Sequence, residues 1–345
     1  MRIGQFGAVV LVAALSACTS SQAPLQSASP PRATPSLAPS ASPSASAAAH
    51  PLAGESAWIA YQTDKGGGEG VWLVHPDGTS DHEIAQNIPG EHLHPDWSPD
   101  GTRLVITSRG EKDTLYELDV ATDQERLLWE CANRCVGDDE AVWSPDGSRI
   151  AFVRALEPFV NDVPSCALHL GDPVSGEVEP LTDTASCLDR ATFPHWSRDG
   201  SRIAYYRGVY EGGTAESTAL YVLDVETGQE TRLTEDELFA GDSDWSAGDQ
   251  WIVFSTYPLN DFQCCQVSNL YRIHPDGSGL EQLTHETGPD GRYTQPRFTP
   301  DGERLLVTHV TPTSRELWIV PADAGGKPIV VSQGGISTHG TMQPT

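Results

Sequence analysis

Trp97-Ser98-Pro99-Asp100-Gly101 is the first of five copies of one short motif in this chain of 345 residues. The copies begin at intervals of 46 to 53 residues, and self-similarity at a nearly fixed period is typical of repeat proteins. The other four copies are Trp143-Ser144-Pro145-Asp146-Gly147, Trp196-Ser197-Arg198-Asp199-Gly200, Trp245-Ser246-Ala247-Gly248-Asp249 and Phe298-Thr299-Pro300-Asp301-Gly302.

Each copy lies between two short segments that have the pattern of β-strands. One strand ends at the aromatic residue, and another follows the glycine, as at Arg103-Leu104-Val105-Ile106. Proline suits the second position of a type I turn and glycine accepts a positive φ angle, so the motif predicts a hairpin. A third strand such as Leu115-Tyr116-Glu117-Leu118 and a fourth such as Thr231-Arg232-Leu233-Thr234 complete a repeat. Four antiparallel strands in about 50 residues predict one blade of a β-propeller.

The two ends of the repeat region predict the number of blades. Before the first motif lie a second, a third and a fourth strand, near Trp58, Val71 and His82. This partial repeat lacks only its first strand, and Thr338-His339-Gly340-Thr341-Met342 resembles the approach to a further motif. We therefore expect an all-β, six-bladed propeller of four-stranded antiparallel blades. The C-terminal strand joins the N-terminal partial blade and closes the ring, which removes the exposed sheet edges.

The N-terminus has the pattern of a bacterial secretory signal. Arg2 precedes an apolar run from Ala8 to Leu15 that is too short to span a bilayer. Leu15-Ser16-Ala17-Cys18 resembles the lipobox of bacterial lipoproteins, which implies cleavage before Cys18 and lipidation of that cysteine. The alternative is an ordinary secretory signal with a chance cysteine. We expect residues 1–17 to be the signal peptide.

The segment that follows has the composition of a disordered tether. Residues 18–52 are almost entirely Ser, Ala, Pro, Gln and Thr after the lipidated cysteine, and they cannot bury enough apolar surface to fold. Residues 53–345 then form the propeller. The predicted location is extracytoplasmic, in the cell envelope, with the lipid on Cys18 as the anchor in the bacterial membrane.

The charge balance excludes one class of partner. The chain has 48 acidic and 21 basic residues and a formal net charge of -27, whereas phosphates require a basic surface. We therefore expect no nucleic acid partner. We also expect a monomer without a cofactor, with Ca²⁺ as a secondary candidate.

The repeats resemble a known family. The pattern Trp-Ser-Pro-Asp-Gly-Ser-Arg-Ile-Ala, at Trp143 to Ala151, is similar to the TolB-like, WD-like propeller repeats of bacterial envelope proteins. The resemblance covers about residues 55–345. TolB itself carries an N-terminal α/β domain, and here only the tether precedes the propeller. The resemblance thus implies a TolB-like propeller rather than TolB, and the partners of the Tol system do not carry over.

The predicted topology divides the loops between two faces. The tight turns, from first to second and from third to fourth strand, lie on one face, and the longer connections lie on the other, which we call the loop face. All six cysteines after Cys18 fall on the loop face, and an even number outside the cytoplasm favours disulfides. Cys166 with Cys187 and Cys131 with Cys135 are the expected pairs. For Cys264 and Cys265 we expect a vicinal disulfide, a cross-loop pair or two thiols. For all six cysteines, metal binding or a redox function is the alternative to structural disulfides.

Polar residues recur at one position of the predicted first strands. Three residues before the motif aromatics stand His94, Glu140, Phe193, Asp242 and Gln295. First strands line the channel of a propeller, so these residues could ring its mouth and bind Ca²⁺ or a polar ligand through oxygen atoms. The alternative is that polar residues line a wet channel.

Histidines could also gather near the axis. His92 and His94 could join His195 or His309 there, and oligogalacturonate lyases, a related propeller family, use histidines with a metal. Surface histidines are the alternative reading of these positions.

Aromatic residues divide into periodic and irregular ones. The motif tryptophans and strand tyrosines recur at matching positions, which indicates packing between blades. Five irregular aromatics in or beside long loops are candidates for stacking on a sugar or peptide: Trp129, Tyr210, Tyr257, Phe262 and Tyr293.

No catalytic signature is found in the sequence: it has no Gly-x-Ser-x-Gly elbow, no His-Glu-x-x-His and no phosphate-binding loop. The expected function is therefore a non-catalytic binding or scaffold module for a protein, peptide or glycan. The alternative is a carbohydrate-active lyase or hydrolase with an axial metal or a carboxylate pair.

Overall fold

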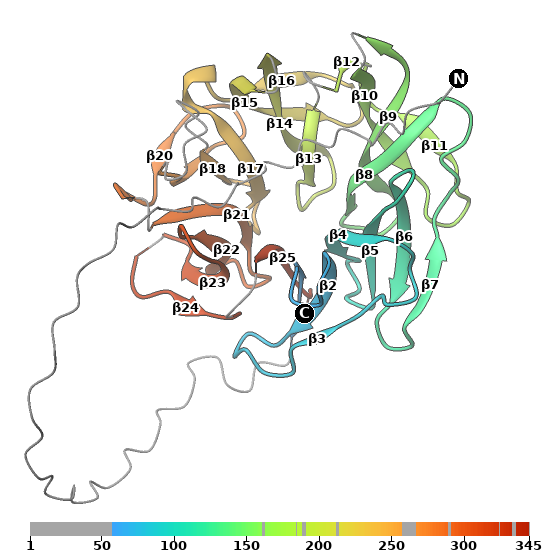
Figure 1. The fold of residues 1–345 in the computed structure, drawn as a ribbon. Helices are drawn as coiled ribbons and strands as arrows, with labels where there is room; N and C mark the ends of the chain where they lie inside the picture. The colour runs from blue at the N-terminus through green and yellow to red at the C-terminus, as the bar shows by residue number, and fades with distance from the viewer. Residues whose placement is uncertain are drawn as a thin grey trace, which may run out of the picture.

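The computed structural model shows six antiparallel sheets arranged as the blades of a closed ring (Figure 1). It describes residues 57–344 except 161–162, 184, 188–190, 212–213, 257–266, 289–290, 324 and 333–335. The predicted all-β, six-bladed propeller is confirmed. In the described part of the chain the helical segment is the short 3-10 turn η1 (Asp236–Leu238), and no helix there is long and apolar enough to cross a bilayer.

The first three blades follow the chain from its N-terminal end, and their strands are given from the axis outward. Blade 1 contains β25 (Ser337–Met342), β1 (Ile59–Thr63), β2 (Gly70–Val74) and β3 (His82–Glu83). Blade 2 contains β4 (Glu91–Trp97), β5 (Arg103–Arg109), β6 (Thr114–Asp119) and β7 (Gln124–Leu127). Blade 3 contains β8 (Cys135–Trp143), β9 (Ile150–Val160), β10 (Val163–Gly171) and β11 (Val178–Pro180), with β12 (Ala185–Ser186) also paired to β10.

The last three blades repeat this order. Blade 4 contains β13 (Ala191–Trp196), β14 (Arg202–Glu211), β15 (Thr214–Asp224) and β16 (Glu230–Arg232). Blade 5 contains β17 (Ala240–Trp245), β18 (Ile252–Thr256), β19 (Leu270–Ile273) and β20 (Glu281–Gln282). Blade 6 contains β21 (Arg292–Phe298), β22 (Arg304–Val310), β23 (Arg315–Pro321) and β24 (Ile329–Val330).

The motif forms the hairpin between the first and second strand of its blade. In the first copy, Asp100 Oδ1 accepts hydrogen bonds from Ser98 Oγ at 2.6 Å and from the Thr102 backbone N–H at 3.0 Å. Gly101 has a φ of 67°, which a side chain would strain, and its N–H donates to the Ser98 carbonyl at 2.9 Å. The aspartate and the glycine together therefore determine the turn.

Apolar side chains fill all six interfaces between neighbouring blades. Each of the six core clusters draws its residues from two adjacent blades. The motif tryptophans belong to these clusters, as expected from their period, and some also bond across the interface. The Trp97 indole N–H donates to the Thr341 carbonyl at 3.2 Å and that of Trp245 to the His195 carbonyl at 3.0 Å. The repeated aromatic residue thus holds adjacent blades together.

The C-terminal strand closes the ring. β25 pairs antiparallel with β1, from Ile59 opposite Met342 to Thr63 opposite Ser337. Gln343 extends this closure through its side-chain amide. The amide nitrogen donates to the Gly101 carbonyl of blade 2 at 2.7 Å, and the amide oxygen accepts from the Trp58 backbone N–H at 3.1 Å. The two ends of the propeller sequence therefore form one blade.

We expect that deletion of residues 337–345 lowers the melting temperature by about 10 °C or more. The deletion exposes the edge of β1 and part of the core between blades 1 and 6, and each kcal/mol shifts the midpoint by a few degrees. Thermal unfolding followed by circular dichroism measures the change. Deletion of Pro344 and Thr345 alone is the control, and an unchanged midpoint in the longer deletion would contradict closure by β25.

We also expect the aspartate turns to contribute to stability in acid. Hydrogen bonds, led by that from Ser98, lower the pKa of Asp100 to about 2, and those led by Ser197 do the same for Asp199. Unfolded aspartate titrates near pH 3.9, so this stabilisation is present above about pH 4 and is lost as the pH falls through about 2.

Thermal melts between pH 5 and pH 2 test this expectation. The double variant Asp100→Asn, Asp199→Asn should lose stability less steeply over that range than the wild type. Glu226→Gln, at an exposed position outside these turns, is the control. Equal slopes in the wild type and the double variant would mean that other carboxyl groups determine acid stability.

Candidate functional site

A bulge interrupts the pairing of every innermost strand at the same place. The register shifts between residues such as Leu93 and Asp96 in β4 or Thr294 and Arg297 in β21. We call the residues at this place, three before the motif aromatic or its counterpart Met342, the axial ring: His94, Glu140, Phe193, Asp242, Gln295 and His339.

Five of the six axial ring residues adopt a left-handed backbone conformation, with φ between 49° and 57°. Such a conformation costs a non-glycine residue about 1 to 3 kcal/mol and is concentrated at functional sites. Proline follows His94, Phe193 and Gln295, and a bulge tolerates a residue that cannot donate to the ladder. The same bulge therefore recurs around the axis with five kinds of side chain, histidine occurring twice.

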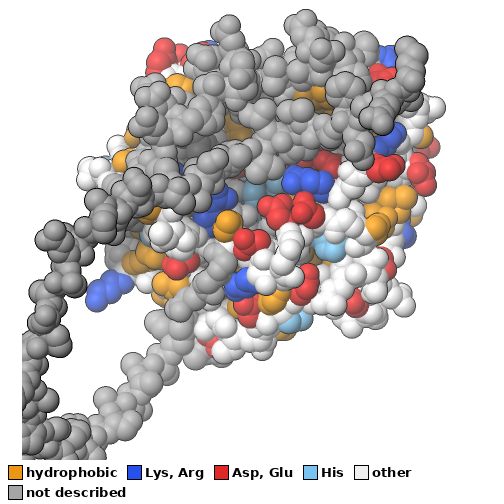
Figure 2. All heavy atoms as spheres, viewed as in Figure 1, with side chains coloured by type: hydrophobic (Ala, Val, Ile, Leu, Met, Phe, Trp, Pro, Cys, Tyr) orange, Lys and Arg blue, Asp and Glu red, His pale blue; other side chains and the backbone are white. Residues whose placement is uncertain are grey.

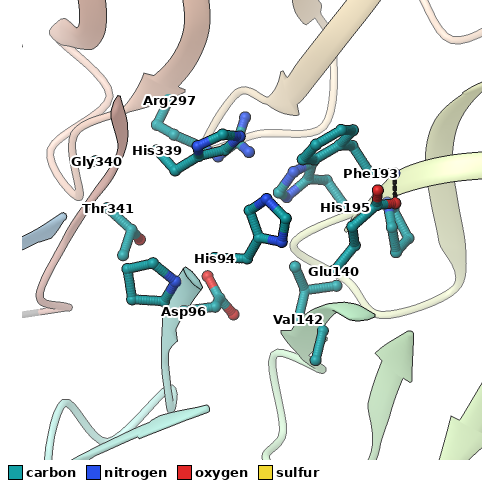
Figure 3. A pocket seen from close by; sticks show the side chains of 13 residues that line it. His94, Asp96, Glu140, Val142, Phe193, His195, Arg297, His339, Gly340 and Thr341 are labelled. Atoms are coloured by element: carbon teal, nitrogen blue, oxygen red, sulfur yellow. Dashed lines mark hydrogen bonds between the residues drawn. The ribbon is translucent and has the colours of Figure 1, made fainter. Parts of the chain in front are cut away.

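The axial ring borders a small cavity of about 30 Å³ on the axis (Figure 3). His94, Glu140, Phe193 and His339 line it, and a second ring, one residue before each motif aromatic or Met342, contributes further lining residues. The members of this second ring are Asp96, Val142, His195, Asp244, Arg297 and Thr341, and all but Asp244 line the cavity.

His94 and Asp139 form an ion pair across blades 2 and 3. The Nδ1 atom of His94 lies 2.8 Å from Asp139 Oδ1. Burial alone would lower the pKa of His94, but the charge and hydrogen bond of Asp139, with a contribution from Glu140, hold that pKa above its usual value. The imidazole is thus held in place and biased toward its charged form.

His339 contacts three other members of the axial ring. Its Nε2 lies 2.6 Å from the Gln295 Nε2 atom, its ring stacks on Phe193 at a centroid distance of 5.5 Å, and it meets His94 edge-on at 4.6 Å. Burial, followed by the charges of His94 and Arg297, lowers the pKa of His339 well below its usual value. His339 is therefore a neutral imidazole at the centre of this group.

Glu140 is oriented by the neighbouring blade. Its Oε2 accepts hydrogen bonds from the Thr192 hydroxyl and from the Phe193 backbone N–H, the latter at 2.8 Å. The carboxylate therefore joins blades 3 and 4 rather than being held for proton transfer.

The second ring combines opposite charges. Asp96 Oδ2 accepts the Trp143 N–H at 2.9 Å, and burial raises the pKa of Asp96 to about 7 although that bond and Arg297 oppose the shift. Burial, followed by the charges of Arg297 and Arg198, lowers the pKa of His195 well below its usual value. Asp96 is therefore the group here that titrates near neutral pH.

The structure brings together only some of the residues proposed from the sequence. His94, Glu140 and Gln295 lie in the axial ring, and Asp242 occupies the equivalent place in β17 with 3% of its surface exposed. Tyr293 lies in β21 against His309 and Trp318. Tyr257 and Phe262 fall outside the described residues.

Trp129 lies in the blade core rather than on the loop surface. It is 7% exposed, its ring packs beside Phe152 at 5.0 Å, and its N–H donates to Asp138 at 3.0 Å. Its partner surface is Gly171, where a Cβ atom would come within 2.2 Å of the indole. In this conformation Trp129 offers almost no surface to a ligand.

Two disulfides brace the loop face, Cys131 with Cys135 and Cys166 with Cys187. Both pairings agree with the expectation from the sequence, and they indicate an oxidising, extracytoplasmic environment. Cys264 and Cys265 lie outside the described residues. The ligand atoms of Cys131, Cys135 and Asp138 come within 4.8 Å of one another, but the sulfurs are bonded together and Arg154 binds Asp138 through two contacts of 2.7 Å.

The axial histidines do not form a prepared metal centre. Among the described residues, His94, His195 and His339 are not a group whose ligand atoms all lie within 4.8 Å of one another. Asp139 binds Nδ1 of His94 and leaves its Nε2 available, but the Gln295 amide occupies Nε2 of His339. The residues present therefore do not fit a metal ion in this arrangement.

Several cavity residues were missed by reasoning from the sequence. Asp96 and Arg297 were not considered, and His195 was given only as a companion of His94. His339 was assigned to the closing strand, although its place three residues before Met342 was the same signal that identified the other members of the axial ring.

We expect Asp139→Asn to lower the pKa of His94 below its usual value. The substitution removes the opposing charge while burial remains, and the loss of one close opposite charge shifts a pKa by about 1 to 3 pH units. Titration of the histidine ring protons by NMR measures it. Glu117→Gln, on β6 of the same blade, is the control, and an unshifted titration in Asp139→Asn would contradict this account of the pair.

Sequence comparisons find a distant relative of this chain. No family model matches the chain. An uncharacterized protein of Agrobacterium fabrum is 26% identical over 212 residues, which are 61% of this chain and 64% of that protein, so the match spans less than two thirds of the relative.

Solved structures resemble the propeller at low sequence identity. TolB from Acinetobacter baumannii has a TM-score of 0.65 at 18% identity, covering 84% of this chain and 67% of its own. A putative TolB from Agrobacterium tumefaciens has a TM-score of 0.58 at 20% identity, covering 84% and 91%. An oligogalacturonate lyase in complex with manganese has a TM-score of 0.51 at 14% identity, covering 81% and 72%. The fold of this chain is that of the TolB-like β-propellers.

Proposed function

We propose that this protein is a lipid-anchored, extracytoplasmic propeller that binds a protein, peptide or glycan through the loop face and the axial ring. One observation carries the proposal: a repeated bulge, strained at five of its six positions, places one side chain from each blade in the axial ring, and four of these side chains line the cavity. Backbone strain that persists at five equivalent positions is typical of a site selected for what it binds.

The domain organisation fits this role. In the proposal, residues 1–17 are a removed signal peptide, the lipid on Cys18 anchors the chain, and residues 18–52 tether the propeller of residues 53–345. A flexible segment of this length reaches roughly 30 to 35 Å. The propeller would therefore act as a monomer that searches for its partner within a short distance of the membrane.

Binding without chemistry agrees with the engagement of the axial carboxylates. Glu140 is bonded to Thr192 and Phe193, and Asp139 is paired with His94, so neither is poised as an acid or base at the cavity. In the part of the face that Figure 2 leaves uncovered, acidic side chains lie with basic ones among them.

A carbohydrate-active enzyme is the second candidate. It is favoured by His94 and His339, which line one cavity, by the contact of Gln295 with His339, and by the likeness in fold to the oligogalacturonate lyase in complex with manganese. The enzyme is disfavoured because the axial residues do not fit a metal ion in this arrangement. The same holds for Ca²⁺ at the axial ring.

Affinity capture from an envelope extract tests the binding proposal. We expect the mature chain to retain a partner, and His339→Gln and Phe193→Ala to weaken the measured affinity for it by about 10- to 100-fold, as for loss of 1.4 to 2.8 kcal/mol. His274→Gln is the matched control, since His274 lies in a tight turn on the opposite face, stacked on Trp251.

The outcomes separate the candidates. If His274→Gln and His339→Gln weakened the affinity for the captured partner equally, the binding site would lie away from the axis. Stoichiometric metal in the purified protein, together with polysaccharide cleavage that is lost in His94→Ala, would replace the binding proposal with the enzyme.

A further inference from the structure

Arg297 is an anomaly in this acidic chain. Its guanidinium lines the axial cavity, and its Nη1 donates to the Ser243 and Pro296 carbonyls at 3.1 and 3.0 Å. Among the described residues, no carboxylate oxygen lies within 4.0 Å of its nitrogens. The other arginine of this region, Arg198, is paired with Asp244 at 3.3 Å.

His195 adds a second nitrogen-bearing group to the same cavity. It is 8% exposed, and no described residue forms a hydrogen bond with its ring. Buried polar groups without partners are uncommon, because their desolvation is not repaid. Arg297 and Arg198 are the permanently charged groups that act on this ring, and His339 acts on it when protonated; each of them disfavours the protonation of His195. The field at this end of the cavity is therefore positive.

The negative groups around the cavity are either paired or neutralised. Asp139 is bound to His94, Asp244 to Arg198, and Glu140 to Thr192 and Phe193. Asp96 is the remaining carboxyl group that lines the cavity, and burial raises its pKa to about 7. The carboxyl group of Asp242, in the axial ring, is buried and does not line the cavity. Asp96 opposes an anion in its charged form and can donate a hydrogen bond to one in its protonated form.

The size of the cavity limits what can enter. About 30 Å³ holds roughly two water molecules, or one small planar group. A sugar ring is too large, whereas an acidic side chain or a chain terminus brings a carboxylate on a slender stem. Arginine is the side chain best suited to such a group, because its planar fork can donate two parallel hydrogen bonds to both oxygens.

We infer that the axial cavity binds a carboxylate carried by a polypeptide partner, with Arg297 as its principal donor and His195 as a second. The inference rests on the proposed binding function and names the chemistry that its ligand must present. By linkage, the bound anion favours the charged form of His195 and the neutral form of Asp96, so binding takes up protons.

Small probes test the inference on the full chain by calorimetry and NMR. N-acetylglycine represents a chain terminus and N-acetylglutamic acid α-amide an acidic side chain; N-acetylglycinamide is the neutral counterpart of the first. We expect one or both acids to bind at least tenfold more tightly than the amide, with affinity rising as the pH falls from 8 to 6. Saturation with the acid should raise the pKa of His195.

Matched variants assign the binding to Arg297. Arg297→Lys should weaken binding of the acid about tenfold through loss of the two-pronged contact, and Arg297→Gln should abolish the preference over the amide. Arg149→Gln is the control, because Arg149 pairs with Glu179 on the exposed outer strands. Thermal melts establish that each variant is folded, and NMR of the His195 ring provides a second readout in the lysine variant.

Three results would overturn the inference: equal affinities for N-acetylglycine, N-acetylglutamic acid α-amide and the neutral amide, unchanged acid binding in Arg297→Gln, or binding of galacturonate more than tenfold tighter than either acid. The inference would also be rejected if His339→Gln weakened capture of the partner and Arg297→Gln did not. That outcome would leave the proposed function standing. Loss of capture in both variants, with the preference for an acid in the wild type, supports both.

Discussion

The structure depends on the pairing of β25 with β1, which joins segments almost 280 residues apart into one blade. Every other interface is formed by blades that follow one another along the chain, so a ring without this pairing would leave two open edges and a divided core. With it, each blade is held on both sides by apolar packing, and hydrogen bonds from the motif, such as those of Trp97 and Trp245, strengthen some of the interfaces. A rigid axis results, and only a rigid axis can hold single side chains from six blades at fixed positions around a cavity of about 30 Å³.

Within each repeat, the residues that determine the fold differ from those that form the site. The Ser-Pro-Asp-Gly turns and the tryptophans are nearly the same in every blade because the same hairpin and the same interface must form each time. The bulge three residues earlier is also repeated, but its side chains differ, from His94 to Phe193 to Gln295. A similar backbone with unlike side chains converts a symmetric ring into an asymmetric cavity, which is positive near Arg297 and has its charges paired near His94 and Arg198.

The fold was largely predictable from the sequence, and the site only in part. The period of the motif and the partial repeat before Trp97 give the number of blades, because turn chemistry and strand alternation are local. Cys166 and Cys187 could be paired because the topology places them at one end of a blade. The burial of Trp129 against Gly171 depends on a contact across strands that no local pattern encodes. Arg297 and Asp96 were not recognised because their roles depend on the groups around them in three dimensions. Arg297 has no carboxylate partner among the described residues, and Asp96 bonds to the next blade, and neither fact can be known before the six blades are assembled.

The second ring has a further consequence for how such a propeller can diversify. Asp96 and Asp244 both accept the backbone N–H of the next blade's motif aromatic, at 2.9 and 2.8 Å, while facing the axis. These two positions therefore connect neighbouring blades, and Arg297 does so through its bond to the Ser243 carbonyl, whereas Val142, His195 and Thr341 have side chains that form no such link. A gene copy that drifts toward a new ligand can exchange the latter three with little risk to assembly, so altered specificity should arise first in blades 1, 3 and 4.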